Sequence, residues 1–285
     1  MDIVPTTCLC GNRDGWPVSM TSDNLVTVQL CKHCGMGYAR NYPDAELLAV
    51  YYRHIYRDRT KDTPETRWNK QVEHGKDILA WLDGDIRFPI SRMLDVGCAT
   101  GGTLHPFWNS AFFYEGIDQN EEFIKYGQSR GVNVRLSTLD EVNDEYSLIL
   151  MRHVLEHVDD PMATLRQCHD RLNDGGYLYV EVPYFFIERG APKEQLLSHH
   201  KWHFRPETLR ASMQAAGFTI VKEEQPNHLR ILGRKAGTRN EACYQPPYTR
   251  REIRSLYMRC LYYNLKTWIR NHTRVFFCLL ILHCL

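Results

Sequence analysis

The sequence has almost no net charge. Its 285 residues include 35 lysines and arginines against 34 aspartates and glutamates, which gives a formal net charge of +1. The overall charge therefore gives no sign of a nucleic-acid partner, because proteins that bind nucleic acid generally carry a basic excess. There is also no internal repeat and no low-complexity tract. With 43% hydrophobic and 24% charged residues, the composition fits one main globular domain with appendages.

Targeting signals are missing as well. Met1–Pro5 carries neither a basic segment nor an apolar stretch, so no secretory signal is visible and a cytoplasmic location is expected. The ten cysteines are then interpreted as reduced thiols and metal ligands, not as disulfides. The apolar run Val275–Leu282 is far shorter than the ~20 residues that span a bilayer. No transmembrane helix is expected.

A strand followed by a loop of small residues stands at positions 93–102. Met93, Leu94 and Val96 predict a buried strand, and the small residues after it let backbone approach a ligand closely. A second strand ends at Asp118, whose carboxylate can accept hydrogen bonds from both ribose hydroxyls of a nucleoside. A glycine turn that merely joins a strand to a helix would account for the loop but not for Asp118.

The loop favours a cationic ligand over a dinucleotide. A pyrophosphate site needs the pattern G-x-G-x-x-G, whereas this loop is D-x-G-x-A-x-G with Asp95 directly before it. That carboxylate would repel a pyrophosphate. It suits S-adenosylmethionine (SAM), which carries an ammonium and a sulfonium and no phosphate.

Two further segments carry a family resemblance. Residues 153–161 follow H-V-L-E-H-V-x-D-P after a strand at 146–151, and residues 172–176 follow L-x-x-G-G before the next strand. From about Arg67 to Lys235 the chain resembles the class I SAM-dependent methyltransferases that act on small molecules. The resemblance implies an α/β, Rossmann-like sheet with helices on both faces and SAM as the cofactor. The implied cofactor-binding residues are Asp95, Gly97, Cys98, Ala99 and Gly101 around the methionine moiety, Asp118 at the ribose, Thr138 and Leu139 at the adenine, and His153 in the cofactor shell. Many members have glycine where this chain has Ala99.

The catalytic base is sought among histidines at the carboxyl end of the sheet, where open α/β folds bind ligands. In sugar C-methyltransferases of similar architecture a loop H-E-H-x-x-Y-F-S carries the base as its last histidine. Aligning Phe204 with that phenylalanine puts His200 on the base position, although His199 then stands where the family has Glu. His153 is the second candidate, with a structural or cofactor-shell role as its alternative. Neither N/D-P-P-Y nor a Pro-Cys nucleophile follows the strand at 146–151, which argues against methylation of nucleic-acid bases.

Two cysteine pairs occupy the N-terminal segment. One residue separates Cys8 from Cys10, two residues separate Cys31 from Cys34, and glycine follows each pair. They resemble the two knuckles of a zinc ribbon, in which four thiolates hold a structural Zn²⁺. The short first spacing strains ligation by all four, so His33 is a substitute ligand. Four buried free cysteines are the alternative.

The chain is expected to divide into four parts. Residues 37–52 resemble the linker of methyltransferases with a ribbon fused upstream, many of which are associated with sugar or glycan biosynthesis. This resemblance favours a carbohydrate or nucleotide-sugar acceptor and O- or C-methylation. The expected parts are a zinc-ribbon-like lobe at 1–42, a linker with cofactor-covering helices at 43–90, the SAM-dependent methyltransferase domain at 91–235 and a basic amphipathic tail at 236–285.

The tail holds eight basic residues against two acidic ones, with apolar residues at helical spacing. It predicts a helix that packs on the catalytic domain or a partner, or one that makes peripheral contact with a membrane. Two other functions remain as alternatives for the whole chain. One is a SAM-binding scaffold or regulator without turnover, and the other is an RNA-modifying methyltransferase that uses the ribbon and the tail together.

Overall fold

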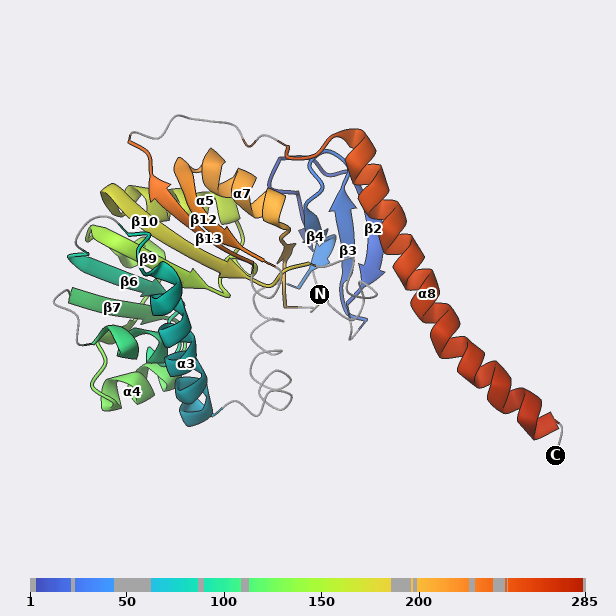
Figure 1. Ribbon diagram of the computed structural model, residues 1–285, viewed down its shortest axis with the longest axis horizontal. Coiled ribbons are helices and arrows are strands. Elements are labelled where there is room, and N and C mark those ends of the chain that lie inside the picture. The colour runs from blue at the N-terminus through green and yellow to red at the C-terminus, as the bar shows by residue number, and fades with distance from the viewer. Residues whose placement is uncertain are drawn as a thin grey trace. The chain divides into compact units, whose positions relative to one another are not determined.

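The structure of the protein is a computed structural model, in which the chain forms two compact units (Figure 1). The small-sheet unit comprises Met1–Asp44, Tyr184–Thr208 and Gln245–Leu285. The large-sheet unit comprises Ala45–Pro183 and Leu209–Tyr244. The structure describes residues 4–21, 24–43, 63–86, 90–108, 113–185, 196, 199–225, 229–237, 244 and 246–283.

A seven-stranded sheet forms the centre of the large-sheet unit, in the order β12-β13-β10-β9-β6-β7-β8. Neighbouring strands are parallel except at β13, which runs antiparallel to both β10 and β12. The predicted Rossmann-like α/β sheet is thus confirmed, and the strands expected at 93–96, before Asp118 and at 146–151 are observed. The L-x-x-G-G segment is expected before the following strand, whereas that strand already begins at Leu172, with an irregularity in its pairing between Leu172 and Tyr177. The strands are β6 (Arg92–Val96), β7 (Phe113–Asp118), β8 (Val134–Leu136), β9 (Tyr146–Arg152), β10 (Leu172–Val182), β12 (Phe218–Glu224) and β13 (Leu229–Lys235).

Helices begin where local capping signals place them. The Thr63 side chain accepts a hydrogen bond from the Thr66 amide at 3.2 Å, with proline at the first helical position. Asp160 caps the helix that Pro161 opens in the same way. The helices of this unit are α3 (Pro64–Leu82), the 3₁₀ turn η2 (Gly102–Phe107), α4 (Glu121–Ser129), the 3₁₀ turn η3 (Leu139–Glu141), α5 (Pro161–Asp170) and α7 (Pro206–Ala215), whose first turn belongs to the small-sheet unit.

Side chains alternate along each strand, so every strand presents side chains to both faces of the sheet. Both faces are buried. Leu148 and Leu150 of β9 belong to one apolar cluster with Trp81 of α3, whose ring meets Tyr179 edge to face at 5.5 Å. Ile149, between the two leucines, is fully buried on the opposite face. Figure 1 shows α3 on one side of the sheet and α5 and α7 on the other.

A four-stranded sheet forms the core of the small-sheet unit, in the order β11-β4-β3-β2. Its members are β2 (Gly15–Met20), β3 (Thr27–Cys31), β4 (Gly37–Ala39) and β11 (Trp202–His203), and β1 (Val4–Pro5) pairs separately with β5 (Asn41–Tyr42). The segment around 202 thus joins this sheet by pairing with β4, although it is far away in sequence.

The C-terminal helix α8 (Arg250–His283) belongs to the small-sheet unit and runs beside β2 (Figure 1). Ile253, Leu256 and Cys260 are buried in one apolar cluster with Val18 and Leu30. The sequence predicts 236–285 as a separate tail, whereas this burial joins the described start of the helix to the N-terminal residues. Of the linker expected at 43–90, residues 44–62 lie outside the described residues, and α3 is the helix observed in the rest. None of the helices in the described part of the chain has the length and apolar character needed to cross a membrane.

Candidate functional site

The loop after β6 turns sharply through left-handed backbone. Gly97 and Gly101 have φ of +72° and +74°, and Ala99 between them has φ of +45°. A Cβ at Gly97 would lie 2.4 Å from Val154 Cγ2, so only glycine fits there. The same conformation costs an alanine on the order of 1–2 kcal/mol. The loop therefore carries little side-chain bulk at these positions, as a closely approaching ligand requires.

Asp118 at the end of β7 ties this loop to the next strand. Its Oδ2 accepts from the Ala99 amide at 2.8 Å and its Oδ1 from the Asn120 amide at 2.7 Å. Each oxygen keeps a second lone pair, so the carboxylate can still accept two hydroxyl donors. The Ser137 amide donates to the Asp118 carbonyl at 3.1 Å, which sets Thr138 beside this strand end. Thr138 and Leu139 are half-buried there.

Asp95 is a buried carboxylate that lacks a hydrogen bond at one oxygen. It is 3% exposed, and its Oδ2 has no partner among the described atoms. Burial, followed by repulsion from Asp118, raises the pKa of Asp95 to about 8, while Arg152 opposes the rise. A carboxyl of this kind is satisfied by a cationic ligand, because the added positive charge offsets the cost of burying a negative one.

Cys98 turns its side chain into the core. It is fully buried, and a Cβ on Gly116 would lie 2.7 Å from its sulfur. Burial raises the pKa of this thiol well above its usual value. The Cys98 side chain is therefore not available to a cofactor.

Gln71 of α3 holds the loop from behind, a role that the sequence analysis missed. Its side chain is 7% exposed, donates to the Cys98 carbonyl at 2.8 Å and accepts from the Thr100 hydroxyl at 2.5 Å. A Cβ on Gly75, one turn further along, would lie 2.3 Å from the Thr103 carbonyl oxygen, so the helix and the loop meet backbone to backbone. The sequence did hold a signal: Gln71 stands three residues after Trp68, which places this polar side chain on the buried face of the helix.

His153 sits between two carboxylates with φ of +53°. Its Nδ1 lies 3.3 Å from Glu156 Oε1, and its Nε2 lies 3.5 Å from Glu181 Oε1. Burial lowers the pKa of His153, but the bonds to Glu156 and Glu181 outweigh burial and raise it above the usual value. Glu181 is also bound by Arg152 at 3.1 Å. This arrangement favours a charged imidazolium, which is a poor proton acceptor.

His200 belongs to the small-sheet unit and is 7% exposed. Its ring lies edge to face with His199 at 4.5 Å, and the Tyr42 hydroxyl donates to the His199 carbonyl at 2.7 Å. His203 of β11 is 6.2 Å from the His200 ring. Burial and then the charge of His199 lower the pKa of His203 to about 3, so His203 stays neutral. The described geometry thus gathers three histidines with little access to solvent.

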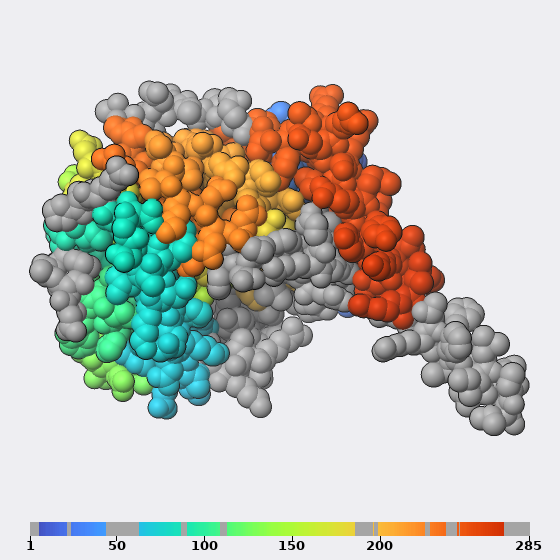
Figure 2. All heavy atoms as spheres, in the orientation of Figure 1, coloured from blue at the N-terminus to red at the C-terminus, as the bar shows by residue number. Residues whose placement is uncertain are grey.

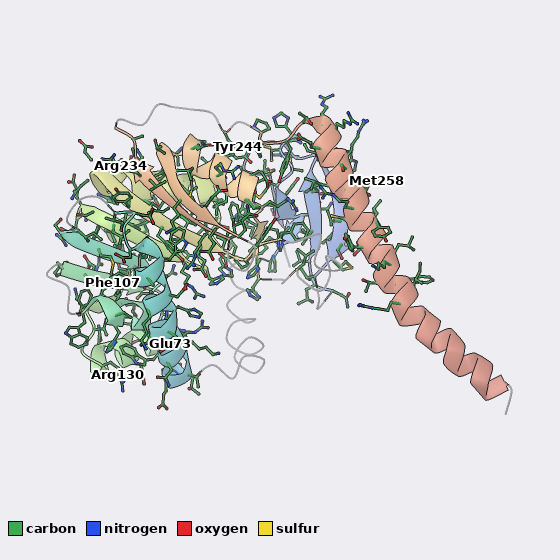
Figure 3. The ribbon with its side chains drawn as sticks, in the orientation of Figure 1. Glu73, Phe107, Arg130, Arg234, Tyr244 and Met258 are labelled. Carbon is green, nitrogen blue, oxygen red and sulfur yellow. The ribbon has the colours of Figure 1, made fainter. Side chains whose placement is uncertain are left out.

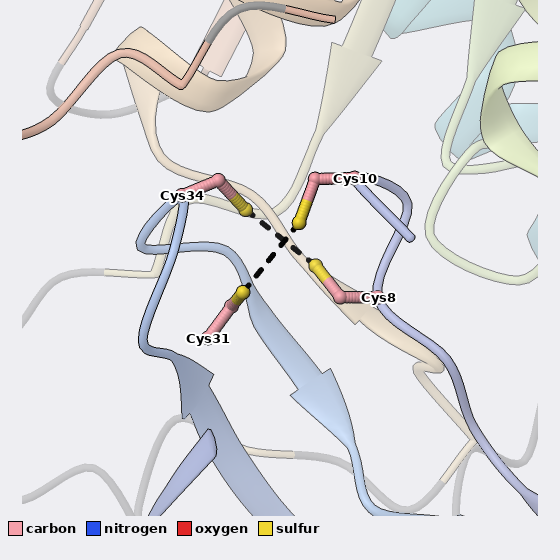
Figure 4. Close-up of side chains that lie close together, drawn as sticks. All are labelled: Cys8, Cys10, Cys31 and Cys34. Atoms are coloured by element: carbon pink, nitrogen blue, oxygen red, sulfur yellow. Dashed lines mark hydrogen bonds between the residues drawn. The ribbon is translucent and has the colours of Figure 1, made fainter. Parts of the chain in front are cut away.

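The four N-terminal cysteines converge on one point (Figure 4). The sulfurs of Cys8 and Cys34 are 3.5 Å apart, those of Cys10 and Cys31 are 3.6 Å apart, and all four lie within 4.8 Å of one another. Four sulfurs at Zn–S distances of ~2.3 Å around a tetrahedral ion would be about 3.8 Å apart. The donor set and spacing therefore fit Zn²⁺.

Backbone geometry explains why the short first spacing suffices. Gly11 and Gly35 have φ of +80° and +73°, which turns the chain back directly after each pair. The Gly11 amide donates to the Cys8 carbonyl at 2.7 Å, and the His33 amide points at Cys31 Sγ at 3.4 Å. His33 thus contributes its backbone to the cluster, while the ligand atoms that meet are the four thiols.

Comparison with known proteins identifies the family. The family model described as "Methyltransferase domain" matches residues 52–223, more than half of the chain. The chain is 26% identical over 161 residues to the ubiquinone biosynthesis O-methyltransferase of Pseudomonas fluorescens, covering 49% of this chain and 69% of that protein. The enzyme of the same name from Parvibaculum lavamentivorans is 31% identical over 98 residues, covering 31% of this chain and 39% of that protein.

Solved structures agree on the fold. Magnesium protoporphyrin IX methyltransferase from Synechocystis PCC 6803 matches with a TM-score of 0.52 at 13% identity, covering 68% of this chain and all of that chain. The glycine loop follows β6 and the acidic residue ends β7, at the carboxyl edge of the sheet where open α/β folds bind ligands. The chain belongs to the methyltransferase-domain family and is a SAM-dependent methyltransferase.

Proposed function

We propose that the chain transfers the methyl group of SAM to an oxygen atom of a small-molecule acceptor. One observation carries the proposal: Asp95 and Asp118 flank a left-handed loop whose backbone a ligand can approach. The sulfonium of SAM is already an activated leaving group. The protein therefore needs mainly to align the two reactants, and alignment is worth roughly 7–11 kcal/mol in well-oriented reactions.

Each residue in and around the loop after β6 has a distinct role in this proposal. The Asp95 carboxylate attracts the ammonium group of SAM, and the free lone pairs of Asp118 accept hydrogen bonds from the ribose hydroxyls. The backbone of Gly97, Ala99 and Gly101 borders the methionine moiety together with that of Cys98. Thr138 and Leu139 border the adenine. Gln71 holds the loop in place without touching the cofactor.

An oxygen acceptor needs a base, because a hydroxyl must lose its proton as the methyl group arrives. We assign this step to His200, the residue that the sequence also favours. The surroundings of His153 support the choice, since Glu156 and Glu181 raise its pKa and so favour the imidazolium over the neutral form that accepts a proton. In this proposal His153 orients the end of β9.

The acceptor class rests on two lines of support. The relatives named ubiquinone biosynthesis O-methyltransferase favour a hydroxyl on a ring compound. The ribbon followed by its linker favours a sugar or nucleotide-sugar hydroxyl, as expected from the sequence. Both chemistries share an oxygen nucleophile, so one experiment with two arms separates them. Purified protein is incubated with labelled SAM and either catechols or nucleotide sugars, and mass spectrometry detects the added methyl group.

Turnover in one arm identifies the acceptor class. If SAM binds but neither arm releases S-adenosylhomocysteine beyond the rate without acceptor, the chain is a SAM-binding scaffold and the proposal fails. Methyl transfer to RNA alone would support the RNA-modifying alternative.

We also propose that the four-thiol cluster holds one structural Zn²⁺. Four thiolates this close repel one another unless a cation sits between them. All four positions of a tetrahedral ion would be filled by Cys8, Cys10, Cys31 and Cys34, so no position is open for substrate. The metal would then stabilise the small-sheet unit and take no part in methyl transfer.

Asp118→Ala is expected to weaken SAM binding at least tenfold while the protein stays folded. Two charge-assisted hydrogen bonds to the ribose would be lost, each on the order of 1.5–3 kcal/mol. Calorimetric titration with SAM measures the affinity, and thermal unfolding checks the fold. Asp144→Ala is the control. This exposed carboxylate forms an ion pair with Arg92 at 3.1 Å and does not belong to the loop. Equal affinity in wild type and Asp118→Ala would contradict the assignment.

SAM affinity is expected to rise with pH up to about 8 and to level off above that value. The pKa of Asp95 without ligand is about 8, so the carboxyl holds a proton at neutral pH. The SAM ammonium favours the carboxylate, and binding therefore releases a proton below that pH. The limit of this dependence is about tenfold per pH unit.

Calorimetry at pH 7 in two buffers of different ionisation enthalpy measures the released proton. Asp95→Asn should bind SAM more weakly and lose the part of the pH dependence that Asp95 contributes. Asp144→Asn should keep the wild-type slope. An unchanged slope in Asp95→Asn would show that another group, such as the amine of SAM itself, titrates.

A further inference from the structure

Helix α8 carries apolar side chains on two separate faces. One face is covered: Ile253, Leu256 and Cys260 are buried against the small sheet. The Tyr257 ring stacks on Trp16 at 5.1 Å, and the Asn264 amide donates to the Val18 carbonyl at 2.7 Å. These contacts hold the described part of the helix against the small sheet and determine which of its faces points outward.

The outward face is an uninterrupted apolar stripe. Its residues recur at intervals of three and four, which places them on one side of a helix. Met258, labelled on the outer side of the helix in Figure 3, is 61% exposed. Figure 2 shows the outer edge of the described part of α8 open in this view. The stripe consists of Met258 (61% exposed), Leu261 (39%), Tyr262 (58%), Leu265 (56%), Trp268 (57%) and Ile269 (46%).

A row of basic residues borders this stripe. Arg259, Lys266 and Arg270 are spaced by seven and four residues and are all exposed, so they lie along one edge of it. No acidic residue occurs in the sequence after Glu252. The helix therefore combines an exposed apolar stripe with positive charge and offers no negative charge beside it.

We propose that this face of α8 docks on a membrane surface that carries anionic lipid headgroups. The apolar stripe would enter the boundary between headgroups and acyl chains, where Trp and Tyr side chains are favoured. The basic row would meet the negative headgroups, and each basic residue near such a surface favours binding about fivefold. The helix would lie along the surface and keep its inner face on the small sheet.

The charge pattern argues against a second copy as the occupant. Pairing two α8 stripes would bring the basic rows of both chains together, and α8 itself supplies no acidic residue after Glu252. Self-association through this face therefore meets like-charge repulsion. Anionic lipid removes that repulsion and covers the same apolar area.

Sedimentation of the full chain with lipid vesicles tests the proposal. We expect binding to vesicles of equal parts phosphatidylcholine and phosphatidylglycerol, binding at least tenfold weaker to phosphatidylcholine alone, and weakening by salt. The variant Leu265→Glu with Trp268→Glu should lose binding at least tenfold. Its matched control is Leu25→Glu with Val221→Glu, two exposed apolar residues outside α8.

The basic row is tested by Arg259→Glu, Lys266→Glu and Arg270→Glu together. The control changes three exposed lysines, Lys70, Lys76 and Lys125, to glutamate and alters the net charge equally. Only the α8 variant should lose binding to anionic vesicles. Wild-type protein that fails to sediment with them, or controls that lose binding as strongly as the α8 variants, would overturn the proposal.

Tryptophan emission provides a second test with a substitution that leaves the charge unchanged and is less disruptive to folding. Anionic vesicles should shift the tryptophan emission of wild-type protein to shorter wavelength, and Trp268→Phe should remove most of this shift. A shift that persists in Trp268→Phe would overturn the proposed orientation. Association of the protein at micromolar concentration without vesicles, abolished by the Leu265→Glu and Trp268→Glu variant, would identify a second copy as the occupant instead.

Discussion

Cys34→Ser is expected to remove zinc from the protein and to destabilise the small-sheet unit. The wild-type chain should contain one zinc per molecule when it is prepared without chelators. Structural zinc sites contribute about 10–16 kcal/mol of apparent binding energy in small domains, so losing one thiolate should be felt throughout the unit. Elemental analysis measures the metal, and thermal unfolding measures the loss of stability.

The effect should extend to the start of α8. A Cβ on Gly35 would lie 2.6 Å from Tyr248 Cδ2, so the ring of Tyr248 rests on the second cysteine turn. Arg205 donates to the Tyr248 hydroxyl at 3.0 Å, which joins this contact to the segment before α7. Hydrogen exchange should therefore accelerate in the first turns of α8 when the metal is removed.

Cys168→Ser provides the matched control, because this thiol is fully buried in α5 of the large-sheet unit. That variant should lose stability but keep its zinc. Wild-type protein that contains no metal would contradict the ribbon hypothesis. Metal retained in Cys8→Ser would indicate that His33 replaces a thiolate, against the convergence of the four sulfurs.

His200→Ala is expected to lower kcat by about two orders of magnitude or more once an acceptor is known. General-base catalysis contributes roughly 10²–10⁴-fold. SAM affinity and melting temperature should stay near the wild-type values, because a base acts on the acceptor and not on the cofactor. The pH–rate profile should also lose an ionisation in the histidine range.

His203→Ala and His200→Gln distinguish chemistry from packing. His203 is 4% exposed with a pKa of about 3, so its removal should lower stability and reduce activity only in proportion to the folded fraction. His200→Gln keeps much of the side-chain volume and should be as inactive as His200→Ala. If either His200 variant keeps most of its turnover, His200 packs the loop and His153 becomes the candidate base.

Local features of the cofactor loop were predictable from sequence because they depend on near neighbours. Gly97 and Gly101 stand where the backbone must turn left-handed, and the buried strand before them has an apolar pattern that few other structures satisfy. Asp118 was predictable as well, since it ends the next strand. The fold class follows from this alternation of strands and helices.

Side-chain partners far apart along the chain were not predictable. Gln71 meets Cys98 across 27 residues, and His153 meets Glu181 across 28, so no local period marks either pair. The positive φ of Ala99 was hidden too, because the sequence shows only a small residue at that position. These contacts depend on which helix packs over the loop and which strands are neighbours.

The sequence by itself determined the Rossmann-like fold class, the glycine loop after β6 and the family, because each depends on motifs of residues close together in the chain. Only the tertiary structure decided that four cysteines with irregular spacing converge, and that α8 joins the N-terminal strands in one unit. Burying Ile253, Leu256 and Cys260 selected one face of α8 for the core. That choice left Met258 and Trp268 outside, because a helix apolar on two faces can bury only one of them against a single sheet.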